Sequence, residues 1–334
     1  MTAGDALPVA RVVVIVVTYK SDELAAEVGR TLSSFLDLST THYCATVENS
    51  GSAATTDALH RELCDQASRH LHLQPSKNVG FSPAVNTAYA AARQRWGPFD
   101  LVVLLNPDVI ADGHLIAEVV AKIEADPTVG IGAPVLVSDD GRVDRGTARR
   151  RWTPLTLFAE VAGFGEHFAR GTRLSRYIPP QGSSALDVDI TSGAFMAVRT
   201  TVLQDRGLDT RLPLYLEDQE ICHRAHMMGY RVTVFPELVA RHIGGVSRTH
   251  NTESQRSLRC MELATAPAMS MHDWSAVPMT VARLTVGVAA TARIAAATAA
   301  LTQPRRRDWA RSQIQLGRWL LAWAVRPKRW GQTL

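Results

Sequence analysis

Near the end of its first third the chain reads Leu101-Val102-Val103-Leu104-Leu105-Asn106-Pro107-Asp108-Val109, an apolar run that stops at a proline. The five apolar residues predict a strand that is buried on both faces. Pro107 cannot donate to a sheet ladder, so the strand ends before it. Asp108 then lies at the carboxyl end of a central strand, the edge at which open α/β sheets bind ligands. A carboxylate there suits a divalent cation, although an Asx-turn that only closes the strand is an alternative.

Strands and helices alternate on both sides of this run. Apolar and β-branched stretches predict strands at residues 12–17, 44–47, 70–73, 101–105, 129–137, 188–198 and 231–235. Caps and helical periodicity predict helices at residues 22–36, 56–67, 83–95, 112–126 and 217–228. The alternation predicts an α/β fold with a doubly wound, mostly parallel sheet. Residues 138–184 show no clean period, and we expect loops and short helices there, packed over the sheet edge.

The first strand-to-helix turn limits the kinds of nucleotide site that fit. It reads Thr18-Tyr19-Lys20-Ser21-Asp22 and contains no glycine. A dinucleotide-binding Rossmann domain, which needs G-x-G-x-x-G at this turn, is therefore a poor fit. A nucleotidyltransferase, which we expect to carry a basic glycine-rich loop here, remains a remote alternative.

The composition describes a globular protein of one large domain plus an appendage. The chain has 334 residues, and its four cysteines have no paired spacing, which fits a reducing compartment. Met1–Ala10 holds no basic residue before the long apolar core, so we do not expect a secretory signal. We place a catalytic domain at residues 1–250 and a helical extension at residues 251–334.

The charge is unevenly distributed along the chain. Residues 276–334 hold ten basic residues against Asp308 alone, a net charge of +9, whereas the whole chain carries +4. Such a basic tail predicts an anionic partner, either a membrane or a nucleic acid. A non-catalytic nucleic-acid-binding protein is the second remote alternative, but the tail's aromatic residues follow helical spacing and predict no base-stacking sheet. We expect no nucleic-acid partner.

The basic tail has two parts. Residues 276–301 are rich in Ala, Val and Thr, but Arg283 and Arg293 make them a poor membrane span, because each arginine costs roughly 3 kcal/mol at a bilayer centre. Residues 313–323 interleave Trp, Leu and Arg, which is typical of an amphipathic helix that lies on a membrane surface. The alternative is a helix docked on the protein's own core.

Seven motifs now stand in an order that resembles the glycosyltransferase family 2 enzymes, which have a GT-A fold. The resemblance is closest to the bacterial rhamnosyltransferase-like branch and covers Val12 to about Ser247. The motifs are Val17-Thr18-Tyr19, Glu48-Asn49-Ser50, Asn78-Val79-Gly80-Phe81, Asn106-Pro107-Asp108-Val109, Ser192-Gly193-Ala194-Phe195, Glu217-Asp218 and His242-Ile243-Gly244-Gly245-Val246-Ser247.

The resemblance assigns roles to individual residues. Glu217 and Asp218 match the catalytic acidic pair, with Asp218 as the base. Asp108 and His242 match positions near the metal, which is expected to be Mg²⁺ or Mn²⁺. Glu48 stands where the family usually has Asp. The donor-binding residues implied by the resemblance are Thr18, Tyr19, Glu48, Asn49, Ser50, Asn78, Gly80, Phe81, Asn86, Asn106, Asp108 and Gly193.

Without the resemblance, some of these residues have simpler interpretations. Glu217 and Asp218 at a helix start could merely complement the helix dipole. His242 could be a structural histidine. Arg224 is expected to pair with an acidic residue of its own helix.

The expected reaction follows from these roles. Displacing a nucleoside diphosphate from a sugar needs a base for the incoming hydroxyl and a cation for the departing diphosphate. A base on the far face of the sugar implies inversion. The resemblance favours rhamnose from a dTDP-linked donor, with a UDP-hexose or UDP-galactofuranose transferase as the alternative. It also implies a cell-wall or surface-polysaccharide acceptor, plausibly linked to polyprenyl diphosphate. The basic tail predicts an enzyme that is peripheral on the cytoplasmic face of the plasma membrane.

Overall fold

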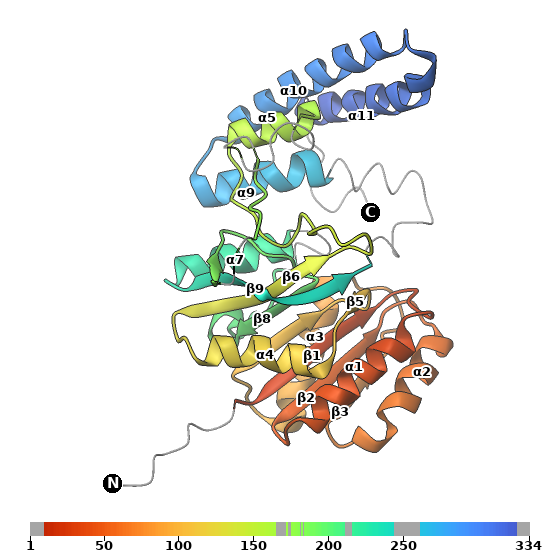
Figure 1. Cartoon of the computed structure of the whole chain (residues 1–334), viewed down its shortest axis with the longest axis vertical. Helices are drawn as coiled ribbons and strands as arrows, with labels where there is room; N and C mark the ends of the chain where they lie inside the picture. Colours follow the sequence, from red (N-terminus) through yellow and green to blue (C-terminus); the bar gives the residue numbers. More distant parts are fainter. Residues whose placement is uncertain are drawn as a thin grey trace. The chain divides into compact units, whose positions relative to one another are not determined.

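The chain forms two compact units, each built from two separate pieces of sequence (Figure 1). The first comprises Met1–Thr147 and Pro180–Ser247, and the second Ala148–Pro179 and Arg248–Leu334. The structure is a computed structural model that describes residues 10–164, 172, 175–180, 182, 184–210, 216–243 and 261–325. The division differs from the single boundary expected at residue 250, because the segment 148–179 contributes a helix that packs in the second unit.

Within the described residues, the first unit is built on a nine-stranded sheet in the order β3-β2-β1-β4-β8-β6-β9-β5, with β7 paired to β9. The strands are β1 (Val12–Thr18), β2 (His42–Glu48), β3 (His70–Leu73), β4 (Leu101–Leu105), β5 (Val109–Ile110), β6 (Val129–Val137), β7 (Leu186–Asp187), β8 (Phe195–Arg199) and β9 (Arg231–His242). Strands β1, β2, β3, β4, β6 and β9 run in one direction, and β5, β7 and β8 run in the other. The expected α/β fold with a mostly parallel sheet is confirmed.

Helices cover both faces of this sheet, because its central strands are apolar on both sides. Every residue of β1 is buried, and Val12, Val14 and Val16 share a core with residues of α1 and α4. The intervening residues of β1 point to the opposite face, where α3 packs. The helices of this unit are α1 (Ala25–Asp37), α2 (Ala53–Leu63), α3 (Phe81–Trp96), α4 (Gly113–Glu124), α6 (Thr200–Leu203) and α7 (Glu217–Met227), and a 3-10 turn, η1, spans Cys64–Gln66.

Two strands differ from the sequence expectation. The stretch 188–198 was expected to be one strand, but β8 begins only at Phe195, because the chain turns at Gly193-Ala194. Strand β9 was expected to end near Phe235, but it continues to His242. A register shift beside Phe235 lets it keep pairing with β6.

The second unit is helical in the residues described. It contains α5 (Pro154–Ala162), a π-helical turn η3 (Met261–Thr265), α9 (Ala266–Ser275), α10 (Met279–Ala300), a 3-10 turn η4 (Pro304–Arg306) and α11 (Arg307–Val325). Its core includes Leu157 of α5, Val286 of α10 and Leu320 of α11, all fully buried. Helix α10 is long and apolar enough to cross a bilayer, judged by length and composition alone. In its most apolar 18-residue stretch, 22% of the residues are buried.

The predicted amphipathic segment 313–323 lies within α11. Leu320 is buried in the core of the second unit, and Leu316, Leu321 and Trp323 pack against that core. These residues therefore follow the alternative interpretation, a helix docked on the protein's own core. Three basic residues of the tail, Arg326, Lys328 and Arg329, lie outside the described residues.

Candidate active site

Three loops at the carboxyl ends of β1, β2 and β3 are joined by side-chain hydrogen bonds. Asn49 is almost fully buried; it donates from Nδ2 to Oδ1 of Asn78 at 2.8 Å and accepts from the N–H of Val79 at 3.0 Å. The hydroxyl of Ser50 accepts from the N–H of Lys20 at 3.1 Å. The donor-binding residues predicted after these three strands therefore lie along one edge of the sheet.

Thr18 and Glu48 end β1 and β2, and both side chains are completely buried. The hydroxyl of Thr18 donates to the carbonyl of Val47 at 3.2 Å, and Tyr19 beside it is half-buried. The carboxylate of Glu48 accepts from the Ser50 hydroxyl at 2.6 Å and from the N–H of Ser52, the N-cap of α2, at 2.8 Å. Glu48 thus fixes the loop that leads into α2. Its predicted contact with the nucleotide stays a prediction.

Helix α3 begins at the same edge. Its N-cap, Gly80, has a φ of 86°, in the left-handed region that favours glycine, and its N–H donates to Asn78 at 2.9 Å. Phe81 follows as the first helical residue, and such a helix N-terminus favours an anion. Further along α3, the Asn86 side chain both accepts from and donates to the backbone of Leu208 at 2.8 Å. Asn86 therefore ties α3 to the segment that follows α6.

A second group of residues lies where β5 pairs with β9. Val109 is opposite His242 in this pair, so Asp108 lies next to that histidine. The Nε2 atom of His242 is 3.5 Å from Oδ1 of Asp108, and Nδ1 is 2.6 Å from Oδ2 of Asp144. Burial lowers the pKa of His242, but the hydrogen bonds and charges of both aspartates outweigh it and raise the pKa to about 9. The imidazolium therefore bridges two carboxylates at neutral pH.

A tight hairpin brings Asp144 to this group. The chain leaves β6 at Val137, turns through Asp140-Gly141, and returns so that Val143 bridges to Val137. Sequence reasoning missed Asp144, because it falls in the unpatterned stretch 138–184. The available signal was the Asp-Gly dipeptide between two valines, which is typical of a hairpin turn.

The predicted catalytic pair, Glu217 and Asp218, begins α7. The preceding residue, Leu216, has a φ of 79°, a strained backbone conformation for a residue other than glycine. Oδ1 of Asp218 accepts from the N–H of Gln219 at 2.8 Å. A Cβ atom built on Gly193 would lie 3.3 Å from Cβ of Asp218, so the Gly193 backbone packs directly against the start of α7.

The Gly193 loop connects Asp218 to the end of β4. The N–H of Asn106 donates to the carbonyl of Ala194 at 2.8 Å, and Asn106 is two residues from Asp108. The start of α7 therefore lies beside the loop that follows the central strand. The predicted site residues brought into this second group are Asn106, Asp108, Gly193, Glu217, Asp218 and His242.

Helix α7 is held rigidly behind the catalytic pair. Arg224 forms an ion pair with Glu220 one turn earlier, as predicted from the sequence. Its guanidinium also donates to the carbonyls of Leu203 at 3.1 Å and Gly207 at 2.7 Å. Glu220 pairs in addition with Arg206 at 2.5 Å. These contacts anchor α7 to the segment after β8 and fix the direction of its N-terminus.

A family model described as glycosyltransferase-like family 2 matches residues 9–262, well over half of the chain. The chain belongs to this family. Solved structures agree with the fold of this glycosyltransferase. It is similar to a mannosyltransferase from Pyrobaculum calidifontis in complex with GDP-Man and Mn²⁺, with a TM-score of 0.59, 19% identity, and coverage of 98% of this chain and 90% of that one.

The glycosyltransferase is also similar to S. aureus TarS, with a TM-score of 0.50, 15% identity, and coverage of 94% of this chain and 55% of that one. Among curated proteins, no sequence match is found. The family resemblance, the GT-A fold and the enzyme class expected from the sequence are confirmed. The last residues of the His242 motif, 244–247, lie outside the described residues.

Asp108 and His242 form a donor set that fits one divalent cation in this glycosyltransferase. Their facing atoms are 3.5 Å apart, and the two side chains are 15% and 16% exposed. A carboxylate oxygen and an imidazole nitrogen both suit Mn²⁺. Among the described residues, no group of three or more His, Cys, Asp or Glu side chains could hold a metal ion. Two protein ligands would leave the remaining positions to substrate oxygens and water.

Proposed function

We propose that this glycosyltransferase is inverting and depends on a divalent cation, and that it moves a sugar from a nucleoside diphosphate to a hydroxyl acceptor. The observation that carries the proposal is the packing of Gly193 against Asp218, which places a carboxylate beside the loop of Asp108. The mannosyltransferase of similar fold was solved with GDP-Man and Mn²⁺, which supports a nucleotide-sugar donor and a metal.

The reaction follows from the positions of the carboxylates. Asp218 accepts the proton of the acceptor hydroxyl as its oxygen attacks the anomeric carbon. The bond from that carbon to the diphosphate oxygen breaks, and the nucleoside diphosphate leaves from the opposite side, so the configuration inverts. Asp108 and His242 would hold the cation, which offsets the charge of the departing diphosphate when bound. The loop of Asn49 and Ser50 forms the nucleotide side of the site.

The proposed donor is dTDP-rhamnose, with a UDP-hexose or UDP-galactofuranose as the alternative. The proposal is supported by the motif order, which resembles the rhamnosyltransferase branch. Competition of dTDP against UDP for the bound donor decides between them, and a clear preference for UDP would favour the alternative.

The proposed acceptor is a cell-wall or surface glycan carried on polyprenyl diphosphate. The net charge of +9 over residues 276–334 supports a location at the cytoplasmic face of an anionic membrane. A lipid-linked acceptor would place the sugar in the active site while its lipid stays in the bilayer.

The test of the catalytic assignment is Asp218→Asn. We expect kcat to fall by 10²–10⁴-fold, because a positioned base contributes about that much, while donor binding stays near wild type. Asp57→Asn on the exposed side of α2 is the matched control and keeps full turnover. A variant at position 218 that retains more than about a tenth of the turnover would exclude the base role.

A further inference from the structure

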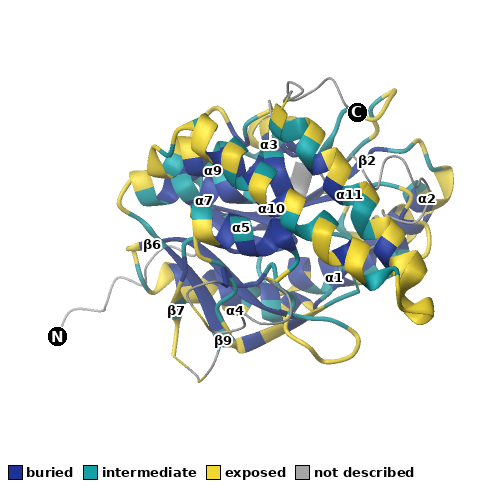
Figure 2. Ribbon diagram, turned by 90° about the horizontal axis from the view of Figure 1, so that it is seen from above, coloured by how far each residue is buried: buried dark blue, intermediate teal, exposed yellow. Residues whose placement is uncertain are grey.

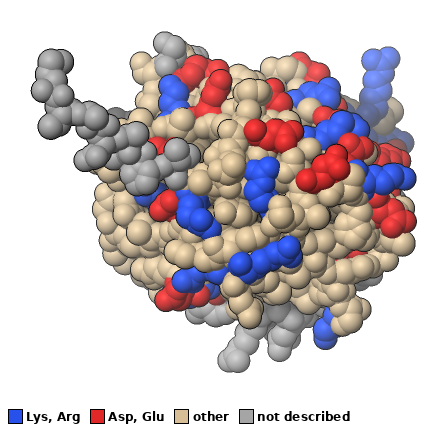
Figure 3. Space-filling model, turned by 90° about the horizontal axis from the view of Figure 1, so that it is seen from below, with Lys and Arg blue, Asp and Glu red and all other residues tan. Residues whose placement is uncertain are grey.

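Helix α10 has an exposed face that carries no charge. A surface helix ordinarily places its charged residues toward water and its apolar residues toward the core. In α10 the exposed positions are instead Ala, Val, Leu or Thr, and Val281, Leu284 and Val288 are 39%, 68% and 61% exposed. Figure 2 shows exposed residues along the length of this helix. Figure 3, by contrast, shows a face of the molecule on which acidic and basic side chains are interspersed.

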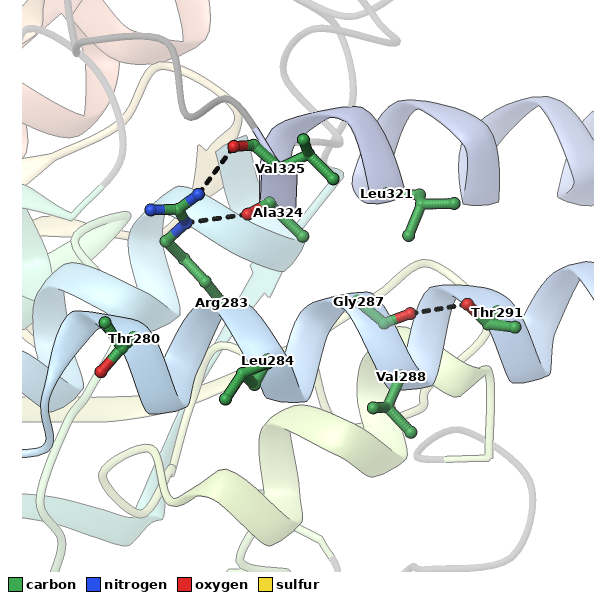
Figure 4. A pocket seen from close by; sticks show the side chains of 9 residues that line it. All are labelled: Thr280, Arg283, Leu284, Gly287, Val288, Thr291, Leu321, Ala324 and Val325. Carbon is green, nitrogen blue, oxygen red and sulfur yellow. Dashed lines mark hydrogen bonds between the residues drawn. The ribbon is translucent and has the colours of Figure 1, made fainter.

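The two arginines of α10 are turned away from that face. Arg283 donates from Nε to the carbonyl of Ala324 at 2.8 Å and from Nη2 to that of Val325 at 2.7 Å, so it caps the end of α11 (Figure 4). Arg293 donates to the carbonyl of Glu160 at 3.0 Å and also bonds the carbonyl of Val161 in α5. Both guanidinium groups hold the helices of the second unit together.

A groove of about 480 Å³ runs between α10 and α11 beside the uncharged face. Its apolar walls include Leu284 and Val288 from α10 and Leu321 and Val325 from α11 (Figure 4). The exposed apolar strip therefore extends across both helices. An apolar surface of this length on a helix pair points to an apolar partner.

Cations line the same side of α11. Arg318 and Arg311 lie seven and fourteen residues before Val325, a spacing that keeps side chains on nearly one side of a helix. Both arginines are exposed, as are Arg305 and Arg306 of the preceding turn. The only acidic residue described in η4 and α11 is Asp308. The apolar strip is thus flanked by positive charge, which selects an anionic partner.

We propose that the outer face of α10, with the groove and the arginines of α11, is a docking surface for an anionic lipid bilayer. The helix pair lies in the plane of the interface with Leu284 and Val288 toward the acyl chains, and the arginines contact the headgroups. Helix α10 does not cross the bilayer, because Arg283 and Arg293 are bound to backbone carbonyls within the unit. The proposal rests on the proposed function in that the surface brings the enzyme to a lipid-linked acceptor.

The test uses full-length protein and vesicles of phosphatidylcholine with or without phosphatidylglycerol. Leu284→Glu combined with Val288→Glu places two negative charges on exposed positions, so the fold is retained. We expect co-sedimentation with the anionic vesicles to weaken at least tenfold. Arg311→Gln with Arg318→Gln should weaken it by roughly fivefold per charge and reduce its dependence on salt. The control is Val239→Glu, at a half-exposed position in the first unit.

Four results would overturn the proposal, and the first three concern vesicle binding. They are wild-type protein that does not bind the anionic vesicles, the double glutamate variant binding them as tightly as wild type, and equal binding to neutral vesicles. A dimer that dissociates in the double glutamate variant would instead assign the face to a second copy, and it also overturns the proposal. Donor hydrolysis in solution is measured in parallel. If wild-type protein does not hydrolyse the donor, the result speaks against the proposed function, whereas vesicle binding tests the docking surface alone.

Discussion

The metal site proposed at Asp108 and His242 should bind Mn²⁺ more tightly as the pH rises. In the metal-free protein His242 is an imidazolium held between Asp108 and Asp144, with a pKa raised to about 9. A cation that binds Nε2 of His242 must first displace the proton from that nitrogen. The proton and the metal therefore compete for one site, and the proton has the advantage at neutral pH.

The size of the change in Mn²⁺ affinity follows from the difference between pH 7 and the His242 pKa of about 9. As long as the pH is below the His242 pKa of about 9, each rise of one pH unit weakens the competition from the proton about tenfold. The apparent affinity for Mn²⁺ should therefore rise about 100-fold from pH 7 and then level off. The stability of the metal-free protein should change in the opposite sense. A raised histidine pKa stabilises the fold fully below the unfolded value near 6.5, and this contribution is lost as the pH rises through about 9.

Calorimetry in buffers of different ionisation enthalpy measures the proton release directly. We expect close to one proton released per Mn²⁺ at pH 7 and fewer at pH 9. His242→Gln should bind the metal weakly and without this pH dependence, whereas Asp139→Asn, an exposed aspartate of the same hairpin, should behave as wild type. An affinity that does not change between pH 7 and 9 would refute the proton-competition argument.

Three further outcomes are expected. Asp108→Ala should abolish metal-enhanced donor binding in calorimetry, and unchanged metal dependence would remove Asp108 from the metal site. Glu48→Ala should lower the free energy of unfolding by about 1–3 kcal/mol in urea, because the partly buried donors of Ser50 and Ser52 lose their acceptor; a change within error would show that water replaces it. Leu320→Ala should cost about 2–5 kcal/mol by leaving a cavity in the second unit, and an unchanged midpoint would place α11 outside that unit's core.

Much of the first unit could be predicted from sequence because its strands are apolar on both faces. The apolar runs at 12–17 and 101–105 predict buried strands, and both are buried throughout. Residues that directly follow such strands could also be placed, since the carboxyl ends of parallel strands meet at one edge. Asp108 was found by that reasoning, whereas Asn49 was assigned through the family resemblance.

The remaining features depend on pairings distant in sequence. Asp144 reaches His242 only because a hairpin folds back along β6, which the sequence period does not reveal. The strand β5 is two residues long and exists only by pairing with residues 241–242. The sequence likewise could not predict what the apolar side of α11 packs against, because tryptophan and leucine suit either a membrane surface or a protein core.

The discontinuous second unit affects how the protein is made. Helix α5 leaves the ribosome long before its packing partner α10, which begins 117 residues after the end of α5. At roughly 5–20 residues per second, Leu157 and Val161 stay without their core for about 6–23 seconds while the first unit folds. Nascent chains released early would expose this apolar helix, so proteins cut near residue 250 should aggregate or recruit chaperones, even though their sheet is intact.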